Sequence, residues 1–238
     1  MTVSTGSTTG DGSTTGDSSD RITGNRVAKV TLTEAFAEFW RHPSPWMILA
    51  TLVGAVVARV LVADWRATDL LAPVVFVALF PVIDWVVHVF VLHWRPRRVG
   101  RVVLDTLLAR EHRRHHQDPR NIPLVFIPWQ TMIGLMVLTV VVPLWVAPTP
   151  GNGLSFMITV GAVGLAYEWT HYLVHTDYKP RGRLYRAVWR HHRLHHFKNE
   201  HYWMTVTTAH TADRLFGTDP DPATVPTSRT AKNLHGLA

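Results

Sequence analysis

Long apolar runs dominate the middle of the chain and predict its architecture. They cover, approximately, residues 46–63, 70–92, 124–147 and 154–174. A helix that crosses a bilayer needs roughly 20 apolar residues, so each run is long enough to span a membrane. The third run contains no charged residue, whereas the other three are interrupted by Arg59, Asp84, Glu168 and His171. Because ionisable side chains inside a span are costly and usually functional, these four residues become candidates for a role.

Polar segments flank the apolar runs on both sides. Residues 1–20 consist mainly of Ser, Thr, Gly and Asp and lack the apolar core of a signal peptide, so we interpret 1–30 as a disordered tail. The first internal apolar segment would then direct membrane insertion. Residues 31–42 begin with the capping-box pair Thr31 and Glu34 and predict a short amphipathic helix, which lies either in the membrane interface or on the protein's own core. The proline-rich residues 217–238 predict an extended, peripheral tail, in which His235 is not expected to be a ligand.

The distribution of basic residues predicts the orientation. The chain has 24 Lys and Arg residues against 17 Asp and Glu, which gives a formal net charge of +7. Of the 24 cations, 22 precede the first run, lie between His93 and Asn121, or follow His175. The positive-inside rule places these segments, and both termini, in the cytoplasm. Membrane topology and anionic headgroups account for the charge, so no nucleic-acid partner is needed. Arg59, inside the first run, is expected to extend outward to the interface.

Histidine carries the candidate chemistry, because the chain contains 15 histidines and no cysteine. Ten of them form four clusters with the spacings HxxxxH, HxxHH, HxxxH and HxxHH, each beside the end of an apolar run. They are His88, His93, His112, His115, His116, His171, His175, His192, His195 and His196. In a helix, positions i, i+3 and i+4 share one face, so converging imidazoles are expected, as a transition metal requires. Ten imidazoles are too many for one ion and fit two.

The HxxxxH pair requires special backbone geometry. Five residues turn an ideal helix by about 500°, which leaves His88 and His93 on different faces. One of the two is therefore expected past the helix end or at a wide turn.

As a set, the four motifs resemble the fatty acid hydroxylase and sterol desaturase superfamily of integral-membrane proteins, over about residues 80–217. The resemblance implies an all-α membrane domain over residues 31–216, with about four transmembrane helices and a cytosolic helical cap. It also implies that the ten histidines hold a dinuclear iron site, which uses O2 and electrons to hydroxylate or desaturate a lipid. Zinc can occupy such an imidazole-rich site in isolated protein. The expected activity is hydroxylation of a membrane lipid, with a fatty acyl chain as the expected substrate.

The surrounding residues suggest supporting roles and partners. Carboxylates one turn from histidine ligands often orient them, which makes Asp84 and Glu168 candidates for an outer shell. Three further histidines are candidates for the same role, namely His191, His201 and His210. Aromatic candidates for a substrate channel are Phe126, Trp129 and Tyr172. No cytochrome b5-like domain is fused to the chain, so electrons are expected from a separate ferredoxin, cytochrome or reductase. Its candidate docking residues are Arg113, Arg114 and Arg193.

Other functions remain open at this stage. Within the same superfamily, the substrate is alternatively a carotenoid ring or a sterol. Outside enzymes, a membrane metal carrier or a heme-binding protein also uses histidines. A carrier needs ligands near the middle of the membrane or on both sides, whereas these cluster on one side. Heme needs two axial histidines per group and leaves most of the set unexplained.

Overall fold

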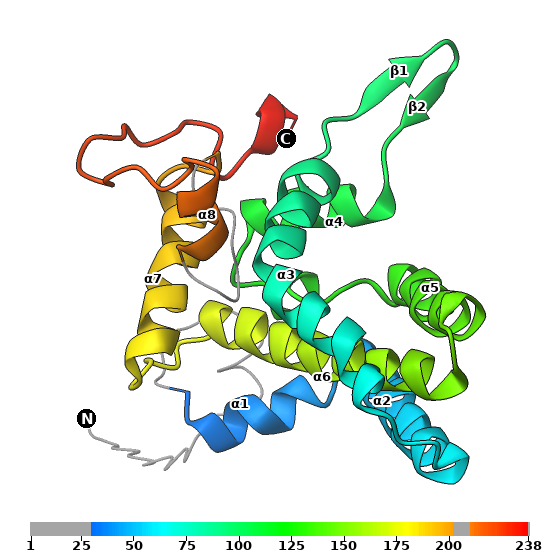
Figure 1. Cartoon of the computed structure of the whole chain (residues 1–238). Coiled ribbons are helices and arrows are strands. Elements are labelled where there is room, and N and C mark those ends of the chain that lie inside the picture. Colours follow the sequence, from blue (N-terminus) through cyan, green and yellow to red (C-terminus); the bar gives the residue numbers. More distant parts are fainter. Residues whose placement is uncertain (1–29, 202–209, 238) are drawn as a thin grey trace, which may run out of the picture.

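The computed structural model describes residues 30–201 and 210–237, and this part of the chain is mainly helical. The main helices are α1 (Leu32–Phe39), α2 (Pro43–Val62), α3 (Leu71–Val87), α4 (Leu107–Gln117), α5 (Trp129–Val146), α6 (Pro150–His175), α7 (Arg183–Phe197) and α8 (Thr211–Leu215). Short 3-10 turns are η2 (Ala67–Leu70), η4 (Ile122–Leu124) and η5 (Leu234–Gly236), and η3 (His88–Leu92) is a π-helix. A hairpin of β1 (Arg97–Val99) and β2 (Val102–Leu104) projects from the helices (Figure 1).

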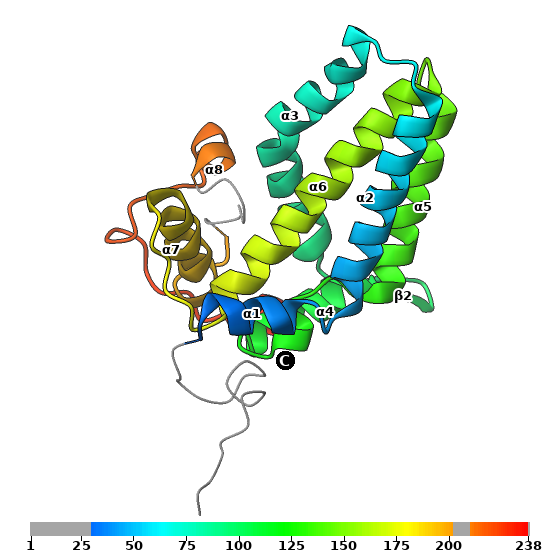
Figure 2. The same ribbon diagram turned by 90° about the horizontal axis from the view of Figure 1, so that it is seen from below.

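The four longest helices, α2, α3, α5 and α6, run side by side in one bundle (Figure 2). Helix α6 packs against each of the other three. Its glycines allow this close approach, because a Cβ added at Gly161 would lie only 3.1 Å from the Cβ of Leu52 on α2. Helix α6 is therefore the centre of the bundle.

Within residues 30–201 and 210–237, three helical segments are long and apolar enough to cross a membrane, namely Pro43–Val62, Ala67–Leu92 and Ile122–Val146. They correspond to the first three predicted spans. Most of their side chains are exposed, as at Val77 and Leu138, and such wide apolar surfaces favour a lipid surrounding over water. The fourth predicted span, 154–174, lies within α6, which is not among the three candidates. Its polar residues, including Glu168 and His171, lower its hydropathy and are buried against neighbouring elements.

The predicted amphipathic helix forms α1 and lies against the end of the bundle. Its capping box is present, because the Thr31 hydroxyl accepts the Glu34 N–H and the Glu34 carboxylate accepts the Thr31 N–H. Phe39 is buried in a core with Tyr172, whereas Phe36 is about half exposed on the other face. The helix therefore packs on the protein's own core with one face and leaves an apolar face outside.

Helices α4, α7 and α8 gather with α1 at one end of the bundle (Figure 2). The C-terminal segment also packs there, and this differs from the peripheral tail that the sequence suggested. Ala231 and Leu234 are buried to 3% and 2% exposure, and Ser228 N–H donates to the carbonyl of Lys198 after α7. The residues after α8 are irregular in structure but belong to the folded part of the protein.

At the opposite end of the bundle, the Arg59 side chain extends to the loop after α2, as expected, but it is buried there and not exposed at the interface. Its guanidinium is 1% exposed and pairs with Asp64 at 3.0 Å and with Asp69 at 2.5 Å. Asn152 of α6 donates to the second Asp69 oxygen at 2.7 Å. A buried charge needs such partners, because an unpaired cation would be costly in a low-dielectric surrounding. The network joins the end of α2 to η2 and to the start of α6.

Candidate metal centre

The ten histidines of the four sequence motifs gather in two groups of five at the α4 and α7 end of the bundle. The first histidine group comprises His88, His93, His112, His116 and His195. Each residue offers one ring nitrogen, and these nitrogens all lie within 4.8 Å of one another. The Nε2 atom of His93 lies 3.2 Å from those of both His112 and His195, and all five side chains are buried.

The second histidine group lies directly beside the first and comprises His115, His171, His175, His192 and His196. The Nε2 atom of His175 lies 2.8 Å from that of His192 and 3.2 Å from that of His115. The two groups touch where the rings of His116 and His196 stack, with their centroids 4.2 Å apart. The helices divide the histidines between the groups. The end of α3 with η3 carries two histidines of the first group, α6 carries two of the second, and α4 and α7 each carry histidines of both groups.

The HxxHH motifs can serve both groups because adjacent residues of a helix point about 100° apart. On α4, His112 and His116 share one face and enter the first group, whereas His115 turns to the second. On α7 the roles are exchanged, since His192 and His196 enter the second group and His195 enters the first. Each HxxHH motif therefore places one imidazole in one group and two in the other.

The HxxxxH motif lies in the π-helix η3, which confirms the expected wide turn. The N–H of His93 donates to the carbonyl of His88 at 3.0 Å, an i to i+5 hydrogen bond. The wider turn places both imidazoles in the first group, which an ideal α-helix would not do.

Burial favours the neutral form of the α4 and α7 imidazoles, which is the form that binds metals. Burial and the neighbouring imidazoles lower the pKa of His112, His115, His192, His195 and His196 well below the usual value. Burial likewise lowers the pKa of His116 to about 3, although its hydrogen bond to the Ala231 carbonyl acts in the opposite direction.

The donor atoms of each group fit a transition-metal ion. Metal–nitrogen bonds of about 2.0–2.1 Å separate neighbouring ligand nitrogens by about 3 Å. The Nε2–Nε2 distances of 2.8–3.2 Å within the groups match this separation. The ring proton of one imidazole can form a hydrogen bond to one neighbouring nitrogen at a time, whereas one cation at the centre of a group attracts the lone pairs of all its nitrogens. Two groups of this kind fit two ions, and imidazole ligands suit iron as well as zinc.

The C-terminal segment supplies contacts to the first group that the side-chain pattern did not reveal. The Nδ1 atom of His116 donates to the carbonyl oxygen of Ala231 at 2.8 Å. The Nε2 atom of His235 donates to the backbone carbonyl of His93 at 3.0 Å. No sequence signal identifies a backbone acceptor, although the apolar Leu234 between the polar Asn233 and His235 is compatible with a packed segment.

The five predicted outer-shell residues lie in different surroundings. The Glu168 carboxylate accepts the Ile127 N–H at 3.1 Å, which holds the start of α5 against α6. Asp84 is buried and borders an apolar cavity between α3, α4, α5 and α6. His201 is largely exposed, with Nε2 3.5 Å from the Glu200 carboxylate. His191 and His210 face one another, with ring centroids 4.5 Å apart, and belong to neither histidine group.

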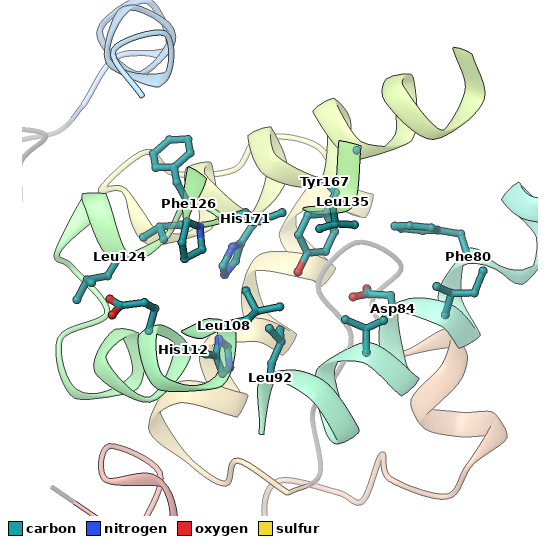
Figure 3. Close-up of a pocket in the computed structure, with 17 residues that line it drawn as sticks. Phe80, Asp84, Leu92, Leu108, His112, Leu124, Phe126, Leu135, Tyr167 and His171 are labelled. Carbon is teal, nitrogen blue, oxygen red and sulfur yellow. The ribbon is translucent and has the colours of Figure 1, made fainter. Parts of the chain in front are cut away.

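A cavity of about 230 Å³ lies between α3, α4, α5 and α6 and reaches both histidine groups (Figure 3). His112 of the first group and His171 of the second form part of its wall. Most of the remaining wall is apolar, as at Phe80, Leu92, Leu108, Phe126 and Leu135. The few polar groups include the Asp84 carboxylate and the Tyr167 hydroxyl, which both point toward the cavity (Figure 3).

A second cavity of about 110 Å³ continues from the first toward α2. The two share Ile127, Leu135, Gly164 and Tyr167 in their walls. Among the three aromatic candidates for a substrate channel, Phe126 lines the first cavity. Tyr172 is fully buried in the core beside Phe39, and Trp129 is exposed at the start of α5.

These features define a helical membrane protein with two adjacent polyhistidine groups able to hold metal ions, beside an apolar cavity. The chain belongs to the fatty acid hydroxylase family, whose model matches residues 73–218, more than half of the chain. This is the superfamily of fatty acid hydroxylases and sterol desaturases that the sequence motifs resemble. Membership identifies the protein as an oxidoreductase. No curated protein and no solved structure is significantly similar to the chain.

Proposed function

We propose that this protein hydroxylates the acyl chain of a membrane lipid, using O2 and two iron ions held by the two histidine groups. One observation carries the proposal: the apolar cavity is walled by one histidine from each group, His112 and His171. A chain of methylenes placed in this cavity would therefore lie beside both metal positions. Family membership supports the same class of reaction.

The metal ions would be held by the five histidines of each group. Bound iron supplies the ability to activate O2 for attack on a C–H bond, which acids, bases and nucleophiles cannot break. One oxygen atom enters the C–H bond, and the other leaves as water with two electrons and two protons from a donor. The buried side chains of both groups hold the metal positions away from bulk water and restrict oxidation to a bound substrate.

The cavity residues would select the carbon that reacts. Apolar side chains such as Phe80 and Leu135 offer an acyl chain a surface equivalent to the lipid interior. Because the second cavity extends past Gly164 toward α2, the end of the chain can pass between α5 and α6. The distance from the α2 side of the second cavity to His171 would then determine which methylene lies at the metals. The headgroup would remain near the basic interface, outside the apolar region.

The proposed membrane arrangement has four spans, with α6 as the fourth. Its 26 residues extend over roughly 39 Å, longer than the apolar thickness of a bilayer. It is surrounded by α2, α3 and α5, so its polar side chains need not face lipid. With four spans, the positive-inside rule would put both termini and the histidine groups in the cytoplasm.

We further propose that electrons come from a separate ferredoxin, cytochrome or reductase that docks on the cytoplasmic side. Arg113 pairs with Asp105 at 2.6 Å and is mostly buried, which leaves it little freedom to bind a partner. Arg114 is 59% exposed and pairs with Glu111 of the same helix, so it is the better docking residue. The guanidinium of Arg193 lies over the Trp189 ring.

The decisive experiment is lipid mass spectrometry on cells that express the protein and grow under isotopically heavy O2. Heavy oxygen in one lipid class with the wild type, and not with His192→Ala, would support the proposal and identify the substrate. His201→Ala, whose side chain is exposed, is the matched control and should retain labelling. A label in a carotenoid or sterol would replace the acyl substrate with another of the same superfamily. Metal-loaded protein that labels no lipid, when supplied with a competent electron donor, would contradict the proposal.

A further inference from the structure

A third cluster of metal-binding side chains lies outside the two histidine groups. His191 of α7, His210 before α8 and Asp219 after α8 each offer one donor atom, and these atoms lie within 4.8 Å of one another. The Nδ1 atom of His210 is 2.7 Å from Asp219 Oδ1. A fourth donor is adjacent, because Asp213 Oδ2 lies 3.6 Å from His191 Nε2.

His191 is the residue that ordinary hydrogen bonding does not explain. Its side chain is completely buried, and neither ring nitrogen has a hydrogen-bond partner among the described residues. Its contact with Asp213 Oδ2, at 3.6 Å, is longer than a hydrogen bond, so the buried ring loses its hydration without a hydrogen bond in return, which costs stability. The ring nevertheless lies against His210, with centroids 4.5 Å apart, so its polar atoms face this cluster.

We propose that His191, His210 and Asp219 bind a single divalent zinc ion that is separate from the two histidine groups. Two imidazoles and one carboxylate form a donor set that zinc commonly takes, with a fourth position for water or another carboxylate. His210 is about one-third exposed, so water can reach the ion from that side. The Nε atom of Arg214 donates to Asp219 Oδ2 at 3.2 Å and thereby orients the carboxylate, leaving Oδ1 for the metal.

Such an ion would hold the segment around α8 against α7. His191 lies on α7, immediately before His192 of the second histidine group, whereas His210 and Asp219 flank α8. The α8 segment also contacts α3, because Trp85 donates to the Thr218 hydroxyl at 3.1 Å and packs on Phe216. The zinc ion would therefore join α7, which carries histidines of both groups, to the segment that packs on α3, which leads into the histidines of η3 in the first group.

Metal analysis of the purified full-length protein tests this proposal without any need for activity. The protein is produced with zinc in the growth medium, and zinc per chain is measured for the wild type, Asp219→Asn and His210→Ala. Each single variant should lose one zinc equivalent per chain, and the double variant should lose no more than either single one. Asparagine keeps the shape of Asp219 and one acceptor oxygen but removes the charge, so this variant tests the carboxylate as a metal ligand with little change in volume.

Two controls separate this site from the histidine groups and from a general loss of structure. His201→Ala removes a nearby exposed histidine and should leave the zinc content unchanged. His192→Ala should reduce metal in the histidine groups, and adding Asp219→Asn should remove one further equivalent. Equal zinc in the wild type and the double variant would overturn the proposal and leave a simple His210–Asp219 hydrogen bond. Simultaneous loss of all zinc in Asp219→Asn would overturn it as well.

Discussion

His116 and Ala231 are 115 positions apart in the sequence, yet the Nδ1 atom of His116 lies 2.8 Å from the carbonyl oxygen of Ala231. A carbonyl oxygen can only accept, so Nδ1 carries the proton and Nε2 offers its lone pair. Nε2 is the atom that faces His112 and His195 in the first histidine group. The C-terminal segment thus fixes the tautomer of a metal-binding residue, as outer-shell acceptors do in metal sites generally.

Removing this acceptor should weaken metal binding. Deleting residues 231–238 eliminates the Ala231 carbonyl and the His235 contact, and we expect metal affinity or turnover to fall by about 10- to 100-fold. The measurement is metal content after dialysis against a weak chelator. Deleting only residues 237–238 keeps both contacts and should retain the wild-type value. Equal metal retention in both deletions would show that the Ala231 contact is unimportant.

The two neighbouring cavities predict a determinant of chain length at Gly164, which borders both. A Cβ at this position would meet only Ile48 Cγ2 at 3.8 Å, so alanine fits, whereas leucine would project into the passage. We expect Gly164→Leu to lower kcat/KM for long acyl substrates by about 10-fold or more and to favour shorter ones, since each excluded methylene costs about 1–3 kcal/mol.

The matched control for this prediction is Gly54→Leu. Gly54 lies on α2, and a Cβ added there would meet nothing within 4 Å, so the same added volume faces outward. Kinetics with a series of acyl-chain lengths provide the measurement. An unchanged chain-length profile in Gly164→Leu would exclude the second cavity as the site of the chain end.

The π-helix η3 predicts that the spacing within HxxxxH is essential. Deleting Val91 converts the motif to HxxxH and removes the i to i+5 bond between His88 and His93. His88 and His93 would then lie one ordinary α-turn apart, and at least one should leave the first histidine group. We expect about one metal ion per chain to be lost while the second group keeps its own. Elemental analysis after purification provides the measurement, and wild-type metal content would contradict the prediction.

The sequence predicted the features that depend on local periodicity. Helical spacing identified the ten histidines, and the five-residue interval between His88 and His93 predicted the wide turn. The sequence could not show how the ten histidines divide into two groups, because the positions of His115 and His116 depend on how α4 is placed relative to α6 and α7. The sequence also could not predict the Ala231 contact, because the acceptor is a backbone carbonyl, which every residue carries.

The buried ion pair of Arg59 and Asp69 predicts a stability effect at the end of the bundle opposite the histidines. Arg59→Met leaves Asp69 and Asp64 without their cation, and breaking a buried pair in this way costs about 3–5 kcal/mol. Asp69→Asn should cost less, because asparagine keeps one acceptor oxygen for the Arg59 guanidinium and loses only the bond that the second carboxylate oxygen accepts from the Asn152 amide. Unfolding in mixed micelles measures both variants.

A double variant distinguishes the pair from simple packing. Arg59→Met combined with Asp69→Asn removes both charges of the closest pair, so its cost should be smaller than the sum of the two single costs by about 1 kcal/mol or more. The histidine groups lie at the other end of α6, so metal content per folded chain should stay at the wild-type value in all three variants. Additive single costs would mean that the contact between Arg59 and Asp69 contributes no coupling energy, and that Arg59 acts through Asp64 and Ser155 instead.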